Sequence, residues 1–341
     1  QPNFFNNHFK VLYGLTEADS NGNFLWTRKL IQFMKYYGIN GLGINSEFFS
    51  DYDTMTHLLN FFADCHVKAK EEGWEFQIHW YDLMTRSGEK SFKNSLNSQN
   101  SSILGPDNNK KVDMFFLNYN WGSAGLASSV RMAKQLPRNS YDIFAGFDIQ
   151  KNALNNYSWK ALSTQPVSIG FWGAHAQSLL HQSATDEGTE DIAIQRAYQK
   201  KLELVFSGGN RNPAFTPELS SGTSLSNTAL KKFHGLASYL TAKSTISDVP
   251  FVSRFNLGNG LKFHNEGKVT FNHKWYNLNT QDLMPTWRWW ITDQNDAVDE
   301  SSISSFVNTN LTFDEAYFGG SCLNVSGKSA FSRLKLFKTL L

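Results

Sequence analysis

The chain alternates short apolar runs with segments long enough to form a helix, and this alternation limits the folds open to it. The apolar runs lie at residues 38–49, 74–82, 112–121, 141–149 and 166–174. Apolar residues recur at helical spacing over residues 24–37 and 53–72, and a glycine follows each of these segments. Strands that alternate with helices build a parallel sheet or a (β/α)8 barrel. We therefore expect an α/β fold of the TIM-barrel type.

Polar or aromatic side chains gather where each expected strand ends. They are Asn45 and Glu47, then Tyr81 and Asp82, then Asn118 and Trp121, then Asp148, and finally Trp172. In a (β/α)8 barrel the carboxyl ends of the strands meet on one face, which is where active sites lie. A single polar strand end is often a solvated loop, but five of them favour a functional site.

The first apolar run, GINGLGINSEFF at residues 38–49, carries Asn45 and Glu47 two positions apart. Side chains two apart on a strand project from the same face. We expect both to lie side by side at the carboxyl end of the strand, with Ile44 in the core. The alternative is a strand that ends at residue 44 and leaves both polar groups in a solvated loop.

Composition and motif spacing exclude several classes of function. The chain has 32 basic and 30 acidic residues and a net charge of +2, which argues against a nucleic-acid partner. Its nine histidines show no H-E-x-x-H spacing, and its two cysteines, Cys65 and Cys322, imply neither a disulfide framework nor a metal site. No apolar run approaches the roughly 18 residues of a membrane-spanning helix. We expect no metal, no cofactor and no membrane-spanning segment.

Catalysis in such a chain would rest on carboxylates and amides. Most glycosidases place two carboxylates across the scissile bond, whereas the neighbour of Glu47 is the amide Asn45. An amide can orient a second amide through paired hydrogen bonds. This suits substrate-assisted hydrolysis, in which the 2-acetamido oxygen of an N-acetylglucosamine attacks its own anomeric carbon while Glu47 serves as acid and then base. We expect Tyr81 to hydrogen-bond the developing oxazolinium.

Seven motifs occur in the order found in glycoside hydrolase family 85, the endo-β-N-acetylglucosaminidases, which the chain resembles from about Asn23 to about Gly327. They are YYGINGLGINSEFF, IHWYDLMT, DMFFLNYNW, YDIFAGFDIQ, VPFVSRFNLGNG, LMPTWRWW and FDEAYFGGSCLNVSG. The resemblance implies cleavage between the two core N-acetylglucosamines of asparagine-linked glycans, with retention through an oxazoline. The N-x-E motif of the family falls on Asn45 and Glu47, and the tyrosine of its W-Y-D motif falls on Tyr81.

The resemblance also bears on substrate contacts and on the extent of the domains. Positions of the glycan cleft fall on Trp80, Asn118, Trp121 and Trp172, and we expect Asp82 and Asp148 to bind substrate as well. The family's N-x-E glutamate ends the fourth barrel strand, yet only about forty residues precede it here. We therefore expect an incomplete barrel with its first strands missing, a catalytic domain over residues 1–300, and the beginning of a β-sandwich domain over residues 301–341.

Two other functions stay open at this point. The first is a barrel that binds glycans without cleaving them, and the second is a glycosidase that pairs Glu47 with Asp82 or Asp148. We expect the polar segments 86–110 and 207–229 to be loops that bind substrate or cover the site, with plain solvated linkers as the alternative. Since glycoprotein glycans lie mostly outside bacterial cells, we expect an extracellular, cell-surface or periplasmic location, with a cytosolic one as the alternative.

Overall fold

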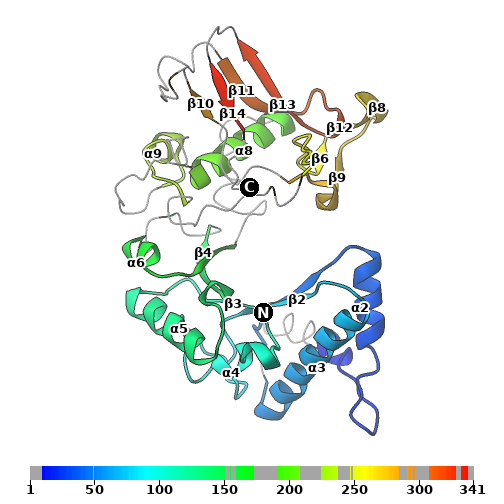
Figure 1. The fold of residues 1–341 in the computed structure, drawn as a ribbon, viewed down its shortest axis with the longest axis vertical. Coiled ribbons are helices and arrows are strands. Elements are labelled where there is room, and N and C mark those ends of the chain that lie inside the picture. The colour runs from blue at the N-terminus through cyan, green and yellow to red at the C-terminus, as the bar shows by residue number, and fades with distance from the viewer. Residues whose placement is uncertain are drawn as a thin grey trace. The chain divides into compact units, whose positions relative to one another are not determined.

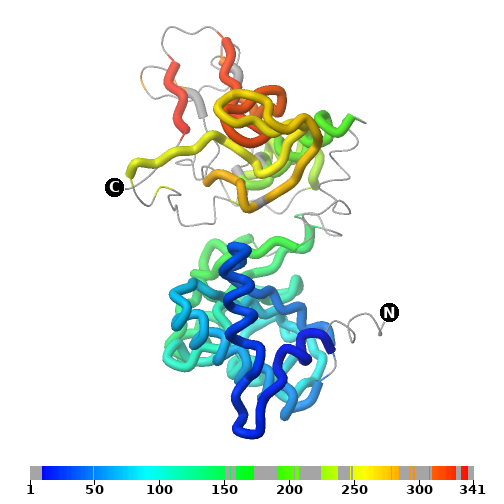
Figure 2. Tube along the Cα trace, turned by 90° about the vertical axis from the view of Figure 1, so that its right-hand side faces the viewer, coloured from blue at the N-terminus to red at the C-terminus, as the bar shows by residue number. Residues whose placement is uncertain are grey.

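The computed structural model describes residues 10–48, 50–149, 154, 159–172, 190–207, 224–236, 246, 249–283, 290–292, 295, 307–327 and 332–336. The chain forms two compact units, Gln1–Asn152 with Asn156–Trp172, and Ala153–Asn155 with Gly173–Leu341. In Figures 1 and 2 the first unit takes the blue to green part of the colour range. These units do not coincide with the division that we expected between residues 300 and 301, and that division stays a prediction about domains.

A five-stranded parallel sheet forms the centre of the first unit. Its strands are β1 (Gly41–Ile44), β2 (Gln77–Tyr81), β3 (Met114–Phe116), β4 (Ile143–Asp148) and β5 (Ser168–Trp172). They lie in the order β1-β2-β3-β4-β5, so each strand pairs with the next one along the chain. The five apolar runs are therefore confirmed as five parallel strands of an α/β fold. Closure of this sheet into a complete or incomplete barrel stays a prediction.

One helix precedes the first strand and others lie between successive strands, and the helical spacing of the sequence predicts the first two of these helices. They are α2 (Thr27–Tyr36), α3 (Tyr52–Glu71), α4 (Ser101–Leu104), α5 (Ser123–Gln135) and α6 (Trp159–Thr164), with the 3-10 turns η1 (Asp107–Asn109) and η2 (Ser140–Asp142). The carboxylate of Asp51 caps α3 by accepting a hydrogen bond of 2.7 Å from the Thr54 amide. Gly38 and Gly73 follow α2 and α3 with φ of 71° and 60°, the left-handed conformation with which helices commonly end.

The two faces of the sheet differ in character. On β2, the buried side chains Ile78 and Trp80 alternate with the exposed Gln77 and His79. The Trp80 ring lies 6.3 Å from that of Phe62 on α3, so the Trp80 face is the one that the helix covers. The opposite face carries His79 and, at the strand end, Tyr81. Residues two apart along each strand thus share a face, and only one face belongs to the helix-packed core.

Two glycines make room for an aromatic ring on the open face of the sheet. Gly146 on β4 and Gly170 on β5 are register partners. A Cβ atom on Gly146 would lie 2.6 Å from the Phe116 ring and 2.5 Å from the carbonyl oxygen of Leu117, and a Cβ atom on Gly170 would also overlap that ring. Phe116 therefore lies across β4 and β5, where side chains would otherwise stand.

The segment 86–110, which we expected to be a loop that binds substrate or covers the site, contains secondary structure and buried side chains. It contains α4 and η1, and Leu96, Asn100, Ile103 and Leu104 are fully buried. Gly88 approaches the backbone of Asp51 so closely that a Cβ atom would lie 2.5 Å from the Asp51 amide nitrogen. The segment is thus packed against the first unit. Of the other expected loop, 207–229, residues 208–223 lie outside the described residues.

The second unit combines helices with short antiparallel strands. Its helical elements are α8 (Asp191–Ser207), α9 (Asn227–Leu230) and η4 (Leu278–Thr280). Its strands are β6 (Asn259–Gly260), β7 (Phe263–Asn265), β8 (Lys268–Phe271), β9 (Trp275–Tyr276), β10 (Trp290–Thr292), β11 (Val307–Thr312), β12 (Phe318–Gly319), β13 (Cys322–Gly327) and β14 (Arg333–Lys335). Antiparallel pairs join β11 with β13, both within residues 301–341 where we expected a β-sandwich to begin, and β14 with β10, which precedes residue 301.

A buried amide links two distant motifs of the second unit. Asn256 is fully buried, and its Oδ1 accepts hydrogen bonds of 3.2 Å from the Gly258 amide and 3.1 Å from the Gly320 amide. Its Nδ2 donates to the carbonyl oxygen of Thr280. Around it, a core cluster holds Phe255, Leu257, Leu311 and Phe313. The Asn256 side chain therefore holds the segments SRFNLGNG and FGGSC next to each other.

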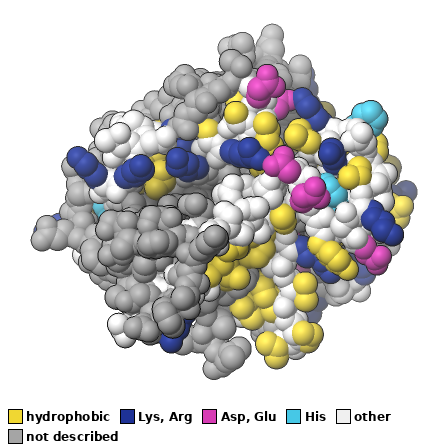
Figure 3. Space-filling model, turned by 90° about the horizontal axis from the view of Figure 1, so that it is seen from above, with side chains coloured by type: hydrophobic (Ala, Val, Ile, Leu, Met, Phe, Trp, Pro, Cys, Tyr) yellow, Lys and Arg dark blue, Asp and Glu magenta, His cyan; other side chains and the backbone are white. Residues whose placement is uncertain are grey.

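In the part of the surface that Figure 3 draws in colour, basic side chains form a row across the upper half, acidic ones lie toward its right end, and an apolar area lies below. Among the helices that the structure describes, none has the length and apolar character needed to cross a bilayer.

Candidate active site

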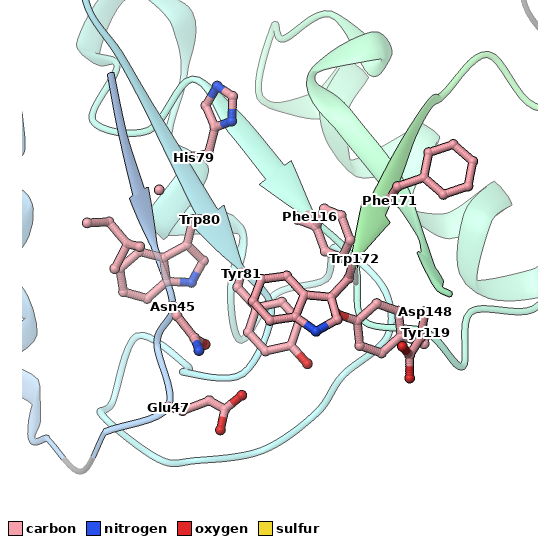
Figure 4. A pocket seen from close by; sticks show the side chains of 12 residues that line it. Asn45, Glu47, His79, Trp80, Tyr81, Phe116, Tyr119, Asp148, Phe171 and Trp172 are labelled. Carbon is pink, nitrogen blue, oxygen red and sulfur yellow. The ribbon is translucent and has the colours of Figure 1, made fainter. Parts of the chain in front are cut away.

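A cleft of about 420 Å³ opens where the parallel strands of the first unit end. It is lined by Gly43, Ile44, Asn45, Glu47, His79, Trp80, Tyr81, Phe116, Tyr119, Asp148, Phe171 and Trp172. These residues come from all five strands and from the segments that directly follow them (Figure 4). The carboxyl ends of parallel strands thus converge on one site, as the sequence predicts.

Asn45, Glu47 and Tyr81 meet in this cleft. Asn45 and Glu47 follow β1, and Tyr81 ends the neighbouring strand β2. In Figure 4 the Asn45 amide, the Glu47 carboxylate and the Tyr81 ring all face the same space. The structure therefore brings together the three residues that we expected to be catalytic.

The residue between them, Ser46, is held on the opposite side. Ser46 is fully buried, and its hydroxyl donates a hydrogen bond of 2.6 Å to the main-chain carbonyl oxygen of Tyr81. Phe48 is buried as well. Burial thus continues to alternate beyond the last residue of β1, and this alternation turns Asn45 and Glu47 toward the cleft.

The hydroxyl of Tyr81 has a defined partner. It donates a hydrogen bond of 2.9 Å to Oδ1 of Asn118, whose side chain is buried. Burial, followed by the negative charges of Glu47 and Asp82, raises the pKa of Tyr81 well above its usual value. Tyr81 therefore keeps its proton at neutral pH. Asn118 does not line the cleft, and it touches the site through Tyr81.

Asp82 lies beneath the cleft and does not line it. Only 1% of its surface is exposed, and its Oδ1 accepts a hydrogen bond of 3.0 Å from Nδ2 of Asn100. Its second oxygen, Oδ2, is buried without a hydrogen-bond partner. Burial raises the pKa of Asp82 to about 7. The structure thus corrects the expected role in substrate binding, because a fully covered carboxyl group anchored to Asn100 cannot reach a ligand in the cleft.

The two tryptophans Trp80 and Trp121 also differ from expectation. Trp80 is among the lining residues, but its side chain is fully buried on the α3 side of the sheet, so its ring offers no exposed platform. Trp121 is 4% exposed, and its Nε1 donates a hydrogen bond of 2.9 Å to the carbonyl oxygen of Gly146. Trp121 therefore holds the loop after β3 against β4.

Asp148 and Trp172 lie where the sequence suggests, at the edge of the cleft formed by β4 and β5. They are register partners at the ends of these strands. The Trp172 side chain is 50% exposed, which suits an aromatic surface for a sugar ring. These two residues remain the candidates for substrate contact.

Four lining residues with ring side chains did not follow from the sequence, namely His79, Phe116, Tyr119 and Phe171. His79 precedes Tyr81 by two positions and shares its face, and its ring stacks on that of Phe144 at 6.4 Å. The rings of Phe116 and Tyr119 lie 6.0 Å and 6.1 Å from that of Tyr81. The spacing of two between His79 and Tyr81 was the only available signal. Within the described part of the chain, no group of three or more His, Cys, Asp or Glu side chains is arranged to hold a metal ion.

A carboxylic acid, an amide and an exposed indole at the ends of parallel strands are typical of α/β enzymes that cleave sugars. Residues 5–263 match the family model of Glycosyl hydrolase family 85. This match covers more than half of the chain, so the chain belongs to glycosyl hydrolase family 85. The family resemblance of the sequence motifs is thereby confirmed.

Curated relatives carry the name cytosolic endo-beta-N-acetylglucosaminidase. The protein of Danio rerio is 23% identical over 255 residues, which are 73% of this chain and 28% of that protein. The protein of Gallus gallus is 24% identical over 258 residues, 73% of this chain and 27% of that protein. The protein of Homo sapiens is 22% identical over 307 residues, 88% of this chain and 34% of that protein. The chain thus spans about a third or less of the length of these relatives.

A solved structure has a similar fold. It is the glycoside hydrolase domain of Endo-D from Streptococcus pneumoniae R6, which matches with a TM-score of 0.70 and 24% sequence identity. The match covers 95% of this chain and 48% of that one. The architecture is therefore shared with this glycoside hydrolase domain, while the activity has to be argued from the site.

Proposed function

We propose that the chain is the catalytic part of an endo-β-N-acetylglucosaminidase that hydrolyses the β-1,4 bond between the two core N-acetylglucosamines of N-linked glycans. The observation that carries this proposal is the convergence of Asn45, Glu47 and Tyr81 on one cleft. Family membership and the names of the curated relatives support it.

The proposed mechanism uses the substrate's own acetamido group. Its carbonyl oxygen attacks the anomeric carbon, while the Glu47 carboxyl group gives its proton to the departing glycosidic oxygen. The products of this step are an oxazoline and the glycan core that remains on the protein. The Glu47 carboxylate then takes a proton from a water molecule, which opens the oxazoline from the opposite face and gives net retention. Asn45 orients the acetamido group through amide hydrogen bonds.

A second candidate is a glycosidase in which Glu47 and Asp148 act as two carboxylates, because both line the cleft. The pairing of Glu47 with Asp82 has no such support, since Asp82 is buried. The two mechanisms differ in their response to a thiazoline analogue of N-acetylglucosamine. This analogue mimics the oxazoline and should inhibit only the substrate-assisted enzyme.

The test is incubation of the full chain with a high-mannose glycopeptide, followed by mass spectrometry of the released glycan. We expect release by the wild-type chain and a loss of at least about a hundredfold in Glu47→Gln, because the amide cannot transfer a proton. Equal rates for both proteins would exclude Glu47 as the acid. Binding without release by either protein would favour a glycan-binding barrel.

The cellular location of the protein can be argued from its proposed substrate. A glycoprotein substrate favours an extracellular, cell-surface or periplasmic site in a bacterium. The relatives named above are described as cytosolic, so they lend no support to this location, and a cytosolic enzyme acting on free oligosaccharides is the alternative.

A further inference from the structure

The hydrogen bond between Tyr81 and Asn118 fixes the orientation of the Tyr81 O–H group. Tyr81 pairs in register with Phe116, the last residue of β3, and Asn118 lies two residues beyond that strand end. The Tyr81 hydroxyl donates to Oδ1 of Asn118 over 2.9 Å. Asn118 is only 5% exposed, so its amide is fixed within the structure and does not swing in solvent.

A phenol hydroxyl has one proton to donate and lone pairs to accept with. Because Asn118 receives the proton, the Tyr81 oxygen can only accept further hydrogen bonds, and it shares this capacity between the neighbouring Tyr119 and a group in the cleft. The surrounding carboxylates support this state, since Glu47 and Asp148 line the same cleft and disfavour a phenolate. The hydroxyl therefore stays neutral and keeps its orientation.

The reaction proposed above creates a need for such an acceptor. When the acetamido oxygen attacks the anomeric carbon, positive charge spreads onto the acetamido nitrogen, and its N–H becomes a stronger donor. We propose that Asn118 is a positioning residue, which turns the Tyr81 oxygen into a hydrogen-bond acceptor for this N–H. The inference rests on the proposed function. Asn45 approaches from the adjacent strand end, so the N–H can be shared between Oδ1 of Asn45 and the oxygen of Tyr81.

This assignment differs from a role of Tyr81 as a donor to the acetamido carbonyl. A donor would hold the attacking oxygen and draw electron density away from it, which weakens the nucleophile. An acceptor at the N–H has the opposite effect, because it stabilises the charge that develops in the transition state. The benefit should therefore be found in kcat rather than in KM.

The test is a double-mutant cycle on the full chain, with Asn118→Leu, Tyr81→Phe and the double variant. We expect each single variant to lower kcat about tenfold, as for one transition-state hydrogen bond, with little change in KM. In the Asn118→Leu background, Tyr81→Phe should cost less than about twofold, because the oriented acceptor is already lost. Asn118→Asp retains an acceptor for the hydroxyl and should stay within about threefold of the wild type.

Two controls separate positioning from folding. Asn120→Leu makes the same chemical change at an exposed position of the same loop, and it should leave kcat within about twofold. If thermal unfolding shows that Asn118→Leu does not fold, Asn118→Ser replaces it in the cycle, because its shorter side chain also withdraws the acceptor.

The outcomes distinguish this inference from the proposed function. Glycan release that is lost in Glu47→Gln, combined with fully additive effects of Asn118→Leu and Tyr81→Phe, would overturn the inference alone. An effect of Asn118→Leu on KM without an effect on kcat would do the same. A wild-type chain that releases no glycan would remove the proposed function and this inference with it.

Discussion

The buried hydroxyl of Ser46 donates a 2.6 Å hydrogen bond to the main-chain carbonyl oxygen of Tyr81. The last registered pair of β1 and β2 is Ile44 with Trp80, so this side-chain bond joins the two strands one step further. It holds Ser46 away from the cleft, and Asn45 and Glu47 on either side of it must then face the cleft.

Replacing Ser46 by alanine should therefore affect both stability and activity. The Tyr81 carbonyl oxygen would lose the bond from Ser46 and keep the one from the Leu83 amide at 2.9 Å, so we expect a cost of about 0.5–1.5 kcal/mol of the free energy of unfolding. We also expect a fall in kcat, since Glu47 would lose its fixed direction. Urea unfolding and glycan release measure the two effects. Ser50→Ala is the matched control, because Ser50 lies in the same loop with a weak, exposed bond to Asp51. Equal stability of both variants would contradict this account.

An alanine at position 170 should strain the open face of the sheet. Its Cβ atom would overlap the ring of Phe116. That ring cannot easily move aside, because the ring centroids of Tyr81 and Tyr119 lie 6.0 Å and 5.8 Å from its own. We expect a loss of about 1–3 kcal/mol, as for an overpacked core. Thermal or urea unfolding of Gly170→Ala measures this loss.

Gly43 provides the control for this prediction, because it lies on β1 in the same cleft and a Cβ atom there would meet nothing within 4 Å. Gly43→Ala should be nearly neutral. In a Phe116→Leu background, Gly170→Ala should cost clearly less than in the wild type. A cost that does not depend on residue 116 would show that backbone strain, not the ring, is the cause.

The strands of the first unit follow from local sequence, and so does part of the site. Apolar runs separated by helix-length segments suffice to predict a parallel sheet, and a spacing of two places Asn45 and Glu47 on one face. The same rule predicts that Trp80 faces away from Tyr81, yet the family resemblance implied a position for Trp80 in the glycan cleft. Its burial against α3 shows that alternation is the stronger guide.

The remaining features depend on which strands pair and in what register. The position of Phe116 over Gly146 and Gly170 is an example, because it joins three strands that are distant in sequence. Trp121 lies beyond the end of β3, where no periodicity indicates the direction of a side chain. Its bond to Gly146 was therefore not predictable from the sequence.

Arg138 should be among the side chains that contribute most to stability. It is buried, and its guanidinium donates to the carbonyl oxygens of Leu104, Val112 and Asp113 at 3.0, 3.0 and 2.8 Å, and to the carboxylate of Asp142 at 2.9 Å.

An ammonium group cannot make this planar, forked set of bonds, so Arg138→Lys should lower the free energy of unfolding by about 2 kcal/mol or more. Arg131→Lys, at an exposed position of α5, should change it by less than about 0.5 kcal/mol. Urea unfolding of the two variants checks this difference, and similar midpoints would refute the structural role of Arg138.

Asp82 should make the stability of the protein depend on pH. Its pKa is raised from the ordinary value of 3.8 to about 7 by burial. Between these values the folded protein holds a proton that the unfolded chain has released. The free energy of unfolding therefore falls as pH rises from about 4 to about 7, by up to about 1.4 kcal/mol per pH unit from this one group.

Asp82→Asn removes this titration and keeps an acceptor for the Nδ2 group of Asn100. The measurement is a series of urea unfolding curves from about pH 4.5 to about pH 6.5, a range that lies between the two pKa values. Over this range we expect the free energy of unfolding of the wild type to fall relative to that of Asp82→Asn. Asp107→Asn, the same change at an exposed position of segment 86–110, should run parallel to the wild type. If Asp82→Asn also ran parallel, Asp82 would have to be ionised in the folded protein throughout this range, with Oδ2 solvated despite its burial.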